Sequence, residues 1–199
     1  MSFRKLRVLL LRSCAIPVIF LAMFVRPSWH FESSTAFIIE FAGYMFLFAG
    51  LVVRMWSILY IGGRKSSELV TDGPYSICRN PLYIGTLFIA VGAGLCFENV
   101  VLLAVTVMVI LPVHYIVARM EEPHLQAKFP VEYPAYMQSV PRFWPRLGIY
   151  RSPPSIMVST RAIGRVLIDT AAVLMIPQLE DLLEVLHQHG IVPVLWVFP

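Results

Sequence analysis

Residues 82–118 read LYIGTLFIAVGAGLCFENVVLLAVTVMVILPVHYIVA, and this stretch decides the fold. Its two apolar runs, Leu82–Phe97 and Val100–Ala118, are separated only by Glu98 and Asn99. A bilayer core of roughly 30 Å is crossed by about 20 helical residues. Within it, backbone hydrogen bonds must be satisfied inside each segment. The stretch therefore predicts two antiparallel membrane helices joined by a tight turn, the first of them short for a full span.

Further apolar runs lie on both sides of this hairpin. Leu6–Val25 and Thr35–Ile61 precede it, and the shorter Ile163–Pro177 and Leu182–Phe198 follow it. The 199-residue chain is 58% hydrophobic and 14% charged, whereas a soluble domain carries about 25% charged residues. We expect an all-α integral membrane bundle of four core transmembrane helices. Residues 162–199 would add a C-terminal helical hairpin or, alternatively, interfacial helices.

The positive charges indicate topology. The net charge is +4, and the basic residues lie between apolar runs, so anionic lipid headgroups explain them better than nucleic acid does. Basic residues within Arg4–Arg7 place the N-terminus in the cytoplasm by the positive-inside rule. The loop 62–81 and the segment 119–161 are then cytoplasmic as well. Residues 1–161 would form a membrane core with a cytoplasmic cap.

The cysteines argue against a disulfide framework or a metal site, and the glycines argue against a soluble nucleotide-binding fold. Cys14, Cys78 and Cys96 are scattered, so neither a disulfide framework nor metal-ligand spacing is visible, and we expect no metal site. Gly92 and Gly94 form a GxG pattern inside an apolar run with no strand before it. Soluble nucleotide-binding folds place such glycines at a strand-to-helix turn. Close helix packing is therefore the favoured interpretation.

The loop before the hairpin carries polar residues at the start of a helix. It contains DGPY at 72–75 and RNPLYIG at 79–85. Pro81 suits a first helical turn, which leaves Asn80 as the N-cap. A helix N-terminus beside Arg79 suits a carboxylate ligand. From spacing alone, a capped helix with interfacial side chains is the more frequent explanation of such a short motif.

Two adjacent carboxylates follow the second run of the hairpin. Neighbouring helical residues point about 100° apart, so Glu121 and Glu122 cannot share a proton. We expect Arg119 to pair with Glu122 three residues on. That pairing would leave Glu121 for a cationic or hydroxyl-bearing ligand. A solvated helix end with a surface salt bridge explains the same residues.

These pieces occur in a fixed order along the chain. They are RMW at 54–56, DGPY, RNPLYIG, the apolar hairpin, RMEEPHL at 119–125, Glu132-Tyr133 and VPRFWP at 140–145. Over about residues 54–145 the chain resembles the isoprenylcysteine carboxyl methyltransferase family and its relatives, the phospholipid N-methyltransferases. The resemblance implies a small helical membrane enzyme that binds S-adenosylmethionine at the cytoplasmic side.

The resemblance also implies which residues hold the methyl donor. They are Arg79, Asn80, Pro81, Tyr83, Gly85, Gly92, Gly94, Glu121 and Glu122. Two positions depart from the family pattern. Many relatives have His where this chain has Asn80, and Asn cannot titrate. Pro123 follows the Glu pair and is expected to break or kink a helix there.

The methyl acceptor stays open between a prenylated cysteine carboxylate, a phospholipid amine, and a small lipophilic acid or thiol. An ionised carboxylate needs no base, whereas an amine must first lose a proton. His114 and His124 are interpreted as packing or surface residues, so no base stands out, which favours carboxyl or thiol acceptors. Arg54 and Arg142 are the candidates for holding an anionic acceptor headgroup, with snorkelling as the equal alternative for Arg54.

A function of another class fits the same sequence. The chain could be a non-catalytic membrane scaffold or lipid-binding protein that retains the fold. An enzyme predicts that Arg79, Asn80, Tyr83 and one of the two glutamates cluster around one cytoplasmic pocket, and a scaffold does not need that cluster. A bacterial inner membrane is the favoured location, and the oligomeric state stays open.

Overall fold

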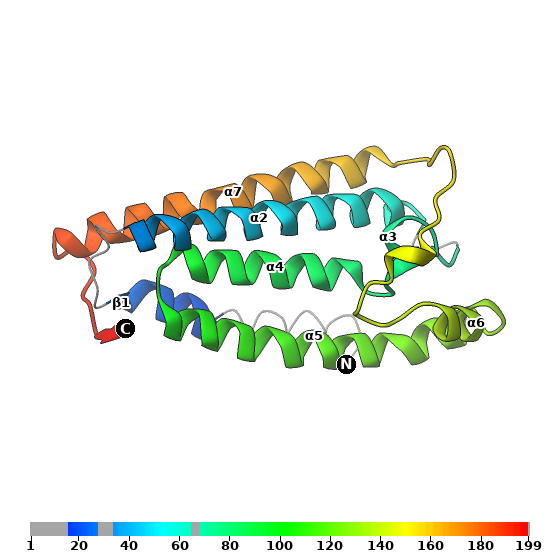
Figure 1. Ribbon diagram of the computed structural model, residues 1–199, viewed down its shortest axis with the longest axis horizontal. Helices are drawn as coiled ribbons and strands as arrows, with labels where there is room; N and C mark the ends of the chain where they lie inside the picture. Colours follow the sequence, from blue (N-terminus) through cyan, green and yellow to red (C-terminus); the bar gives the residue numbers. More distant parts are fainter. Residues whose placement is uncertain (1–15, 28–33, 65–67, 199) are drawn as a thin grey trace.

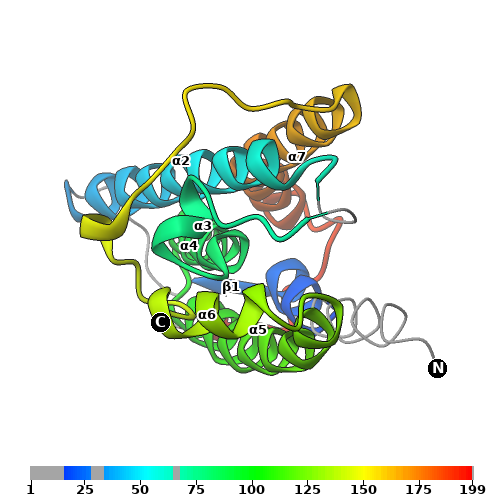
Figure 2. The same ribbon diagram turned by 90° about the vertical axis from the view of Figure 1, so that its right-hand side faces the viewer.

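The computed structural model describes residues 16–27, 34–64 and 68–198. Long helices that lie side by side dominate this part of the chain (Figure 1): α2 (Ser34–Ile61), α4 (Pro81–Cys96), α5 (Val100–Lys128) and α7 (Thr160–Gln188). Seen from the end, α4 is at the centre, with α2, α5 and α7 around it (Figure 2). The predicted all-α bundle is confirmed.

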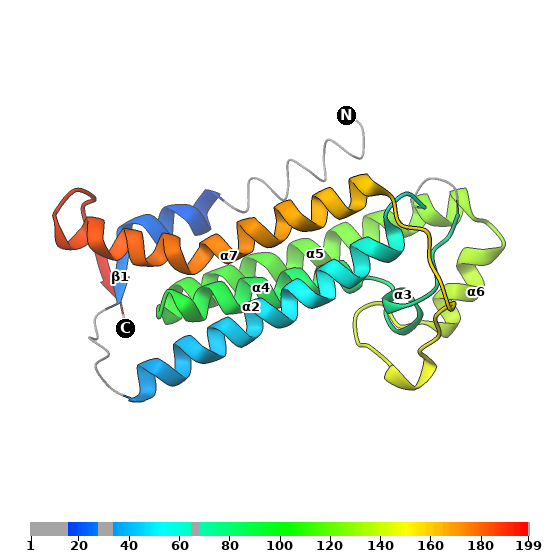
Figure 3. The same ribbon diagram turned by 90° about the horizontal axis from the view of Figure 1, so that it is seen from above.

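Short elements lie at the two ends of the bundle (Figure 3). At one end are α3 (Pro74–Ile77), α6 (Glu132–Ser139) and the single 3₁₀ turn η1 (Leu147–Ile149). At the other end, β1 (Val25–Pro27) follows helical residues 16–24 and pairs in parallel with β2 (Trp196–Phe198). The cap predicted for residues 119–161 therefore lies at the α3/α6 end, which helix α5 reaches with its last turns.

Three helices of the described residues are long and apolar enough to cross a membrane: Phe37–Ile61, Val100–Lys128 and Thr160–Gln188. Their outer faces expose large apolar side chains, such as Phe48 at 65% and Met108 at 72%. Exposed apolar surface of this extent suits lipid contact and not water. The chain is an integral membrane protein, and the shorter α4 is enclosed by the longer helices. Residues 6–15, half of the predicted run Leu6–Val25, lie outside the described residues.

Glycines bring α2 and α4 into backbone contact. A Cβ atom on Gly50 of α2 would lie 2.7 Å from the carbonyl oxygen of Gly85 in α4. A Cβ atom on Gly92 would lie 2.8 Å from the carbonyl oxygen of Gly43. Small residues allow such close approach between membrane helices. The packing interpretation of the small residues in α4 is confirmed.

The hairpin turn at Glu98 and Asn99 is confirmed, but α5 is longer than its apolar run. The Asn99 side chain accepts a hydrogen bond from the Leu102 amide, and Glu98 adopts a left-handed φ of 49°. Helix α5 then continues to Lys128 with Pro123 inside it. Of the two expected effects of Pro123, a break or a kink, the break does not occur. Proline removes one N–H donor and crowds the preceding turn, yet the helix continues through this position.

The tail differs from the predicted hairpin, because α7 is one continuous helix from Thr160 to Gln188. The Ser159 side chain caps its start by accepting from the Ala162 amide. Within this helix the carboxylate of Asp169 binds Arg54, and the helix continues through it. Only after Gly190, with a φ of 68°, does the chain turn back to form β2.

Candidate functional site

A cavity of about 860 Å³ opens between α2, α4, α5 and the elements of the α3/α6 end. This volume is within the range of about 300–1,000 Å³ that is usual for small-molecule sites. Its polar lining includes Arg79, Tyr83, Glu121 and Glu122. Its apolar lining comes from the bundle and includes Ile58, Leu82, Ile110 and Val113. One cavity therefore joins the charged end of the bundle to its apolar interior.

Glu122 is held by two arginines from different parts of the chain. Arg79 Nη1 donates to its Oε1 at 2.8 Å. Arg142 donates to both carboxylate oxygens, from Nε at 2.8 Å and from Nη2 at 2.6 Å. The predicted pairing with Arg119 is wrong, since Arg119 donates instead to the Tyr115 hydroxyl at 3.3 Å. Helix α5 turns Glu122 toward α4 and the cap, which puts it out of reach of its neighbour on the same helix.

Glu121 has a different partner, as the angle between adjacent helical residues requires. Its Oε2 accepts a hydrogen bond from the Tyr83 hydroxyl at 2.9 Å. The ring of Tyr83 also meets the ring of His114 edge-on, with 4.8 Å between the centroids. Tyr83 therefore links the carboxylate to a histidine deeper in α5.

The start of α4 is built as predicted, but Asn80 uses its side chain differently. Pro81 occupies the first turn, and Asn80 is the N-cap residue without a capping side-chain bond. Its Nδ2 donates instead to the carbonyl oxygen of Arg142 at 3.1 Å. The Arg79 amide donates to the carbonyl oxygen of Pro141 at 2.9 Å. These bonds fasten the loop after α6 along the start of α4.

Two buried polar atoms on the cavity wall have no hydrogen-bond partner within the described part of the chain. They are the hydroxyl oxygen of Tyr75 and the Nε atom of Arg79. Burial raises the pKa of Tyr75 above its usual value, so the phenol stays protonated and can donate. A buried polar group without a partner costs about 1–3 kcal/mol. Both atoms are hydrogen-bond donors, so each suits an acceptor oxygen.

Arg54 lies farther along the cavity and joins three helices. Its Nη1 donates to Thr86 Oγ1 in α4 at 2.6 Å, and its Nη2 to Asp169 in α7 at 2.5 Å. Arg142, the other arginine proposed for an acceptor headgroup, is paired with Glu122. Both guanidinium groups thus have carboxylate partners within the protein. Their role toward an acceptor stays a prediction.

The residues implied for the methyl donor divide into two groups. Those that line the cavity are Arg79, Asn80, Pro81, Tyr83, Glu121 and Glu122. Gly85 and Gly92 lie instead in the α2–α4 contact, and Gly94 packs against Leu103 of α5. Any effect of these glycines on a ligand would be exerted through helix packing.

Sequence reasoning missed other cavity residues. Tyr75 belongs to the DGPY motif, and that motif was the available signal. His114 was interpreted as a packing residue, although it lines the cavity. Tyr136 donates from its hydroxyl to the Tyr75 carbonyl oxygen at 2.7 Å, and no local pattern predicts this contact across the cap.

Comparison with known proteins shows a family to which part of the chain is similar. Residues 38–132 match the family described as phospholipid methyltransferase. The match covers α2, α4, α5 and the loop that carries DGPY and RNPLYIG, and so includes most of the cavity wall. The resemblance to this family that the sequence predicted is confirmed over these residues.

Two curated proteins are similar to the chain. A nickel-cobalt-cadmium resistance protein, NccN, of Alcaligenes xylosoxydans xylosoxydans is 40% identical over 60% of this chain and 55% of its own length. A cobalt-zinc-cadmium resistance protein, CzcN, of Cupriavidus metallidurans is 34% identical over 70% of this chain and 64% of its own length. The chain thus spans less than two thirds of either relative. No solved structure matches it.

Proposed function

We propose that this protein is a member of the phospholipid methyltransferase family and transfers a methyl group from S-adenosylmethionine to a lipophilic acceptor at the cytoplasmic face of a bacterial inner membrane. One observation carries the proposal. A single cavity joins Arg79, Glu121 and Glu122 at the α3/α6 end to apolar walls inside the bundle. A charged methyl donor and an apolar acceptor chain need these two environments side by side.

The chemistry of the polar end fits S-adenosylmethionine. The molecule carries an ammonium, a carboxylate, a ribose diol and a sulfonium, and when bound it would supply an activated methyl group. The carboxylate of Glu121 suits the ammonium or the diol. The Nε atom of Arg79 and the Tyr75 hydroxyl, both buried without partners in the described residues, suit the donor's carboxylate.

The other residues around the cavity position and shield these groups. Methyl transfer is an in-line displacement, so its main demand is alignment in a site that excludes water. Arg142 fixes Glu122 at two points, and Asn80 ties the same loop to the start of α4. The loop thereby closes the polar end. Ile58, Leu82 and Val113 would face the apolar chain of the acceptor.

The site favours an enzyme over a non-catalytic scaffold or lipid-binding protein. A scaffold that had only retained the fold would not need Arg79, Tyr83 and Glu121 gathered around one cavity. The names of the two relatives refer to metal resistance, so direct binding of a metal ion is a function to consider. Within the described residues, however, no group of three or more His, Cys, Asp or Glu side chains could hold a metal ion. We therefore propose methylation of a lipophilic molecule, and not direct metal capture, as the chemistry.

The test is transfer of a tritiated methyl group from S-adenosylmethionine into organic-extractable product. The purified protein is reconstituted in nanodiscs of phosphatidylethanolamine and phosphatidylglycerol supplemented with a total bacterial lipid extract. We expect label in the organic phase with the wild type, and a loss of about 100-fold in Glu121→Ala, in line with misaligned substrate. Glu184→Ala, an exposed residue at the far end of α7, is the matched control. A folded wild type that transfers no label would favour the scaffold.

A further inference from the structure

His114 lies in the part of the cavity away from the charged end. It precedes Glu121 by seven residues on α5, so the two share a helix face at a separation of about 10 Å along the axis. Both line the cavity, and the His114 side chain belongs to a residue that is only 9% exposed. Tyr83 spans the distance, with its hydroxyl on Glu121 and its ring against His114.

The local hydrogen bond fixes which ring nitrogen carries the hydrogen. Nδ1 of His114 lies 2.8 Å from the carbonyl oxygen of Ile110, one turn earlier. Because a carbonyl oxygen only accepts, Nδ1 is the donor, and in the neutral ring Nε2 presents a lone pair. No residue of the described ranges bonds to Nε2. The residue itself is 9% exposed and lines the cavity, where this lone pair can accept a hydrogen bond from a ligand.

The ionisable groups that the structure relates to His114 already have partners of their own. They are Arg54 on α2, Tyr83 on α4, and Glu121 on the same helix, to which Tyr83 is bonded. Arg54 is paired with Asp169 of α7, and Glu121 accepts from Tyr83. The remaining wall at this depth is apolar and includes Ile110 and Val113. The Nε2 lone pair is thus the proton acceptor best placed for a molecule in the apolar part.

We propose that Nε2 of His114 takes the proton of the methyl acceptor, whose nucleophilic atom is therefore a protonated heteroatom, as in a lipophilic thiol or amine, and not an ionised carboxylate. This inference rests on the proposed function. The hydrogen leaves the acceptor as a proton and binds to Nε2. The electron pair of the acceptor atom forms the new bond to the methyl carbon, and the carbon–sulfur pair stays with the sulfur of the donor. His114 would thus be the base that these acceptors require, whereas the sequence alone indicated no base.

The experiment compares two substitutions with a matched control. His114→Asn can keep a donor to the Ile110 carbonyl, and His114→Gln keeps an amide near the Nε2 position, but neither supplies a base. His189 makes the same bond to a carbonyl oxygen four residues earlier, Nδ1 to Val185 at 2.8 Å, and is exposed at the end of α7. His189→Asn therefore removes an equivalent histidine outside the cavity.

Three probes of equal chain length separate the acceptor classes: decanethiol, decylamine and decanoate, each supplied with tritiated S-adenosylmethionine. We expect transfer to the thiol or the amine, and a kcat about 100-fold lower in both His114 variants, the low end of general base catalysis. Affinity for S-adenosylhomocysteine, measured by calorimetry, should change less than about twofold, as expected for a group outside the donor site. The wild-type kcat/KM should fall toward acid pH as the imidazole protonates, and this dependence should vanish in the variants.

The outcomes against the proposal are distinct. Transfer to decanoate alone, transfer to none of the probes by a protein that binds S-adenosylhomocysteine, or unchanged kcat in either variant would overturn it. Loss of kcat together with a lower unfolding temperature in His114→Gln but not in His114→Asn would assign the effect to packing and overturn it as well. A wild type that does not bind S-adenosylhomocysteine would instead overturn the proposed function itself.

Discussion

Arg142 binds Glu122 at two points, with Nε 2.8 Å from Oε1 and Nη2 2.6 Å from Oε2. The pair joins the loop after α6 to the end of α5, and only 12% of the Glu122 side chain is exposed. Arg79 adds a third bond to the same carboxylate. The polar wall of the cavity is therefore a preorganised network and not a set of independent surface charges.

The geometry of this pair predicts that Arg142→Lys is not a conservative change. An ammonium cannot reproduce the planar fork that reaches both carboxylate oxygens. We expect affinity for S-adenosylhomocysteine to fall about 10-fold, which corresponds to about 1.4 kcal/mol. Calorimetry measures it. Arg146→Lys, in the same loop but exposed, should bind as the wild type does. Equal affinities of the two variants would contradict the role of the fork.

The glycine contacts predict opposite effects for two Gly→Ala substitutions. In Gly92→Ala, the new Cβ would meet the Leu47 amide nitrogen at 2.7 Å and destabilise the bundle by about 1–3 kcal/mol. Gly164 in α7 has nothing within 4 Å of its Cβ position, so Gly164→Ala should stabilise it by about 0.5–1 kcal/mol. Unfolding temperatures in detergent test both. A Gly92→Ala protein as stable as the wild type would show that α2 and α4 are not in backbone contact.

The thiol of Cys78 predicts a loss of stability at alkaline pH. Burial raises its pKa from 9.0 to about 11. Because the folded-state pKa is raised, this contribution to stability is complete below pH 9 and is lost as the pH rises toward 11. It amounts to about 2–3 kcal/mol in full. The unfolding temperature of the wild type should fall between pH 8.5 and 10 more steeply than that of Cys78→Ala. Parallel curves would mean that the thiol ionises normally.

The Arg54–Asp169 pair predicts strong coupling between α2 and α7. Removing either charge leaves the other without its partner, whereas removing both does not. Arg54→Met and Asp169→Leu should each lower stability, and the double variant should be about 1 kcal/mol more stable than the sum of the two effects. A double-mutant cycle of unfolding free energies measures this coupling. Additive effects would show that the pair does not hold the tail in place.

The membrane helices were predictable because bilayer thickness sets the length of an apolar run. Thr35–Ile61 and the hairpin at Glu98-Asn99 therefore emerged from the sequence with nearly correct bounds. The tail did not, because Asp169 interrupts the apolar pattern, and only its contact with Arg54, from a distant part of the chain, explains why the helix continues. A hydropathy profile reports how apolar a segment is, and it does not report ion pairs between distant segments such as Arg54 and Asp169.

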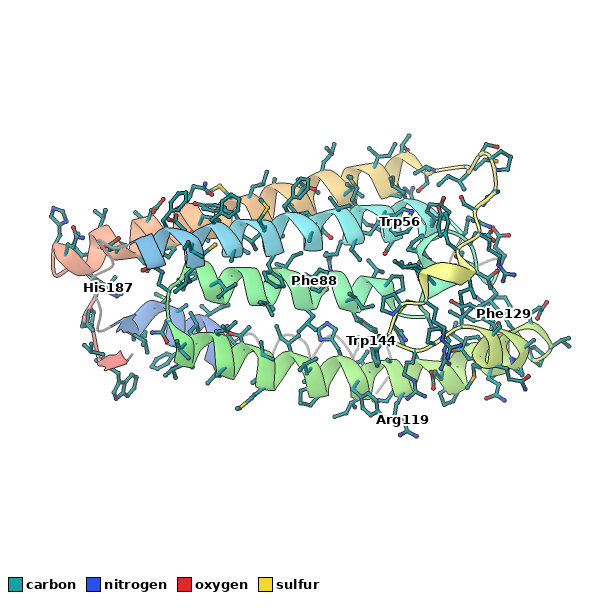
Figure 4. The ribbon with its side chains drawn as sticks, viewed as in Figure 1. Trp56, Phe88, Arg119, Phe129, Trp144 and His187 are labelled. Carbon is teal, nitrogen blue, oxygen red and sulfur yellow. The ribbon has the colours of Figure 1, made fainter. Side chains whose placement is uncertain are left out.

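The candidate site was predictable in its residues but not in its partners. Arg79, Tyr83, Glu121 and Glu122 do line one cavity, as the motif order indicated. The partner of Glu122 was assigned to Arg119, because helical spacing is the only contact rule that a sequence supplies at this position. Arg142 comes from a loop 20 residues on. Figure 4 shows Phe129 and His187 at opposite ends of the bundle, and the cavity reaches the end that holds Phe129.

The central claim is that the cavity binds the methyl donor, and calorimetry with S-adenosylhomocysteine on detergent-purified protein tests it most directly. The wild type should show saturable binding to one site. Glu121→Ala and Arg79→Ala should each weaken it by at least about 10-fold, or about 1.4 kcal/mol, and Glu184→Ala should not. Absence of binding by a folded wild type, in detergent and again in nanodiscs, would contradict the account and favour a membrane scaffold.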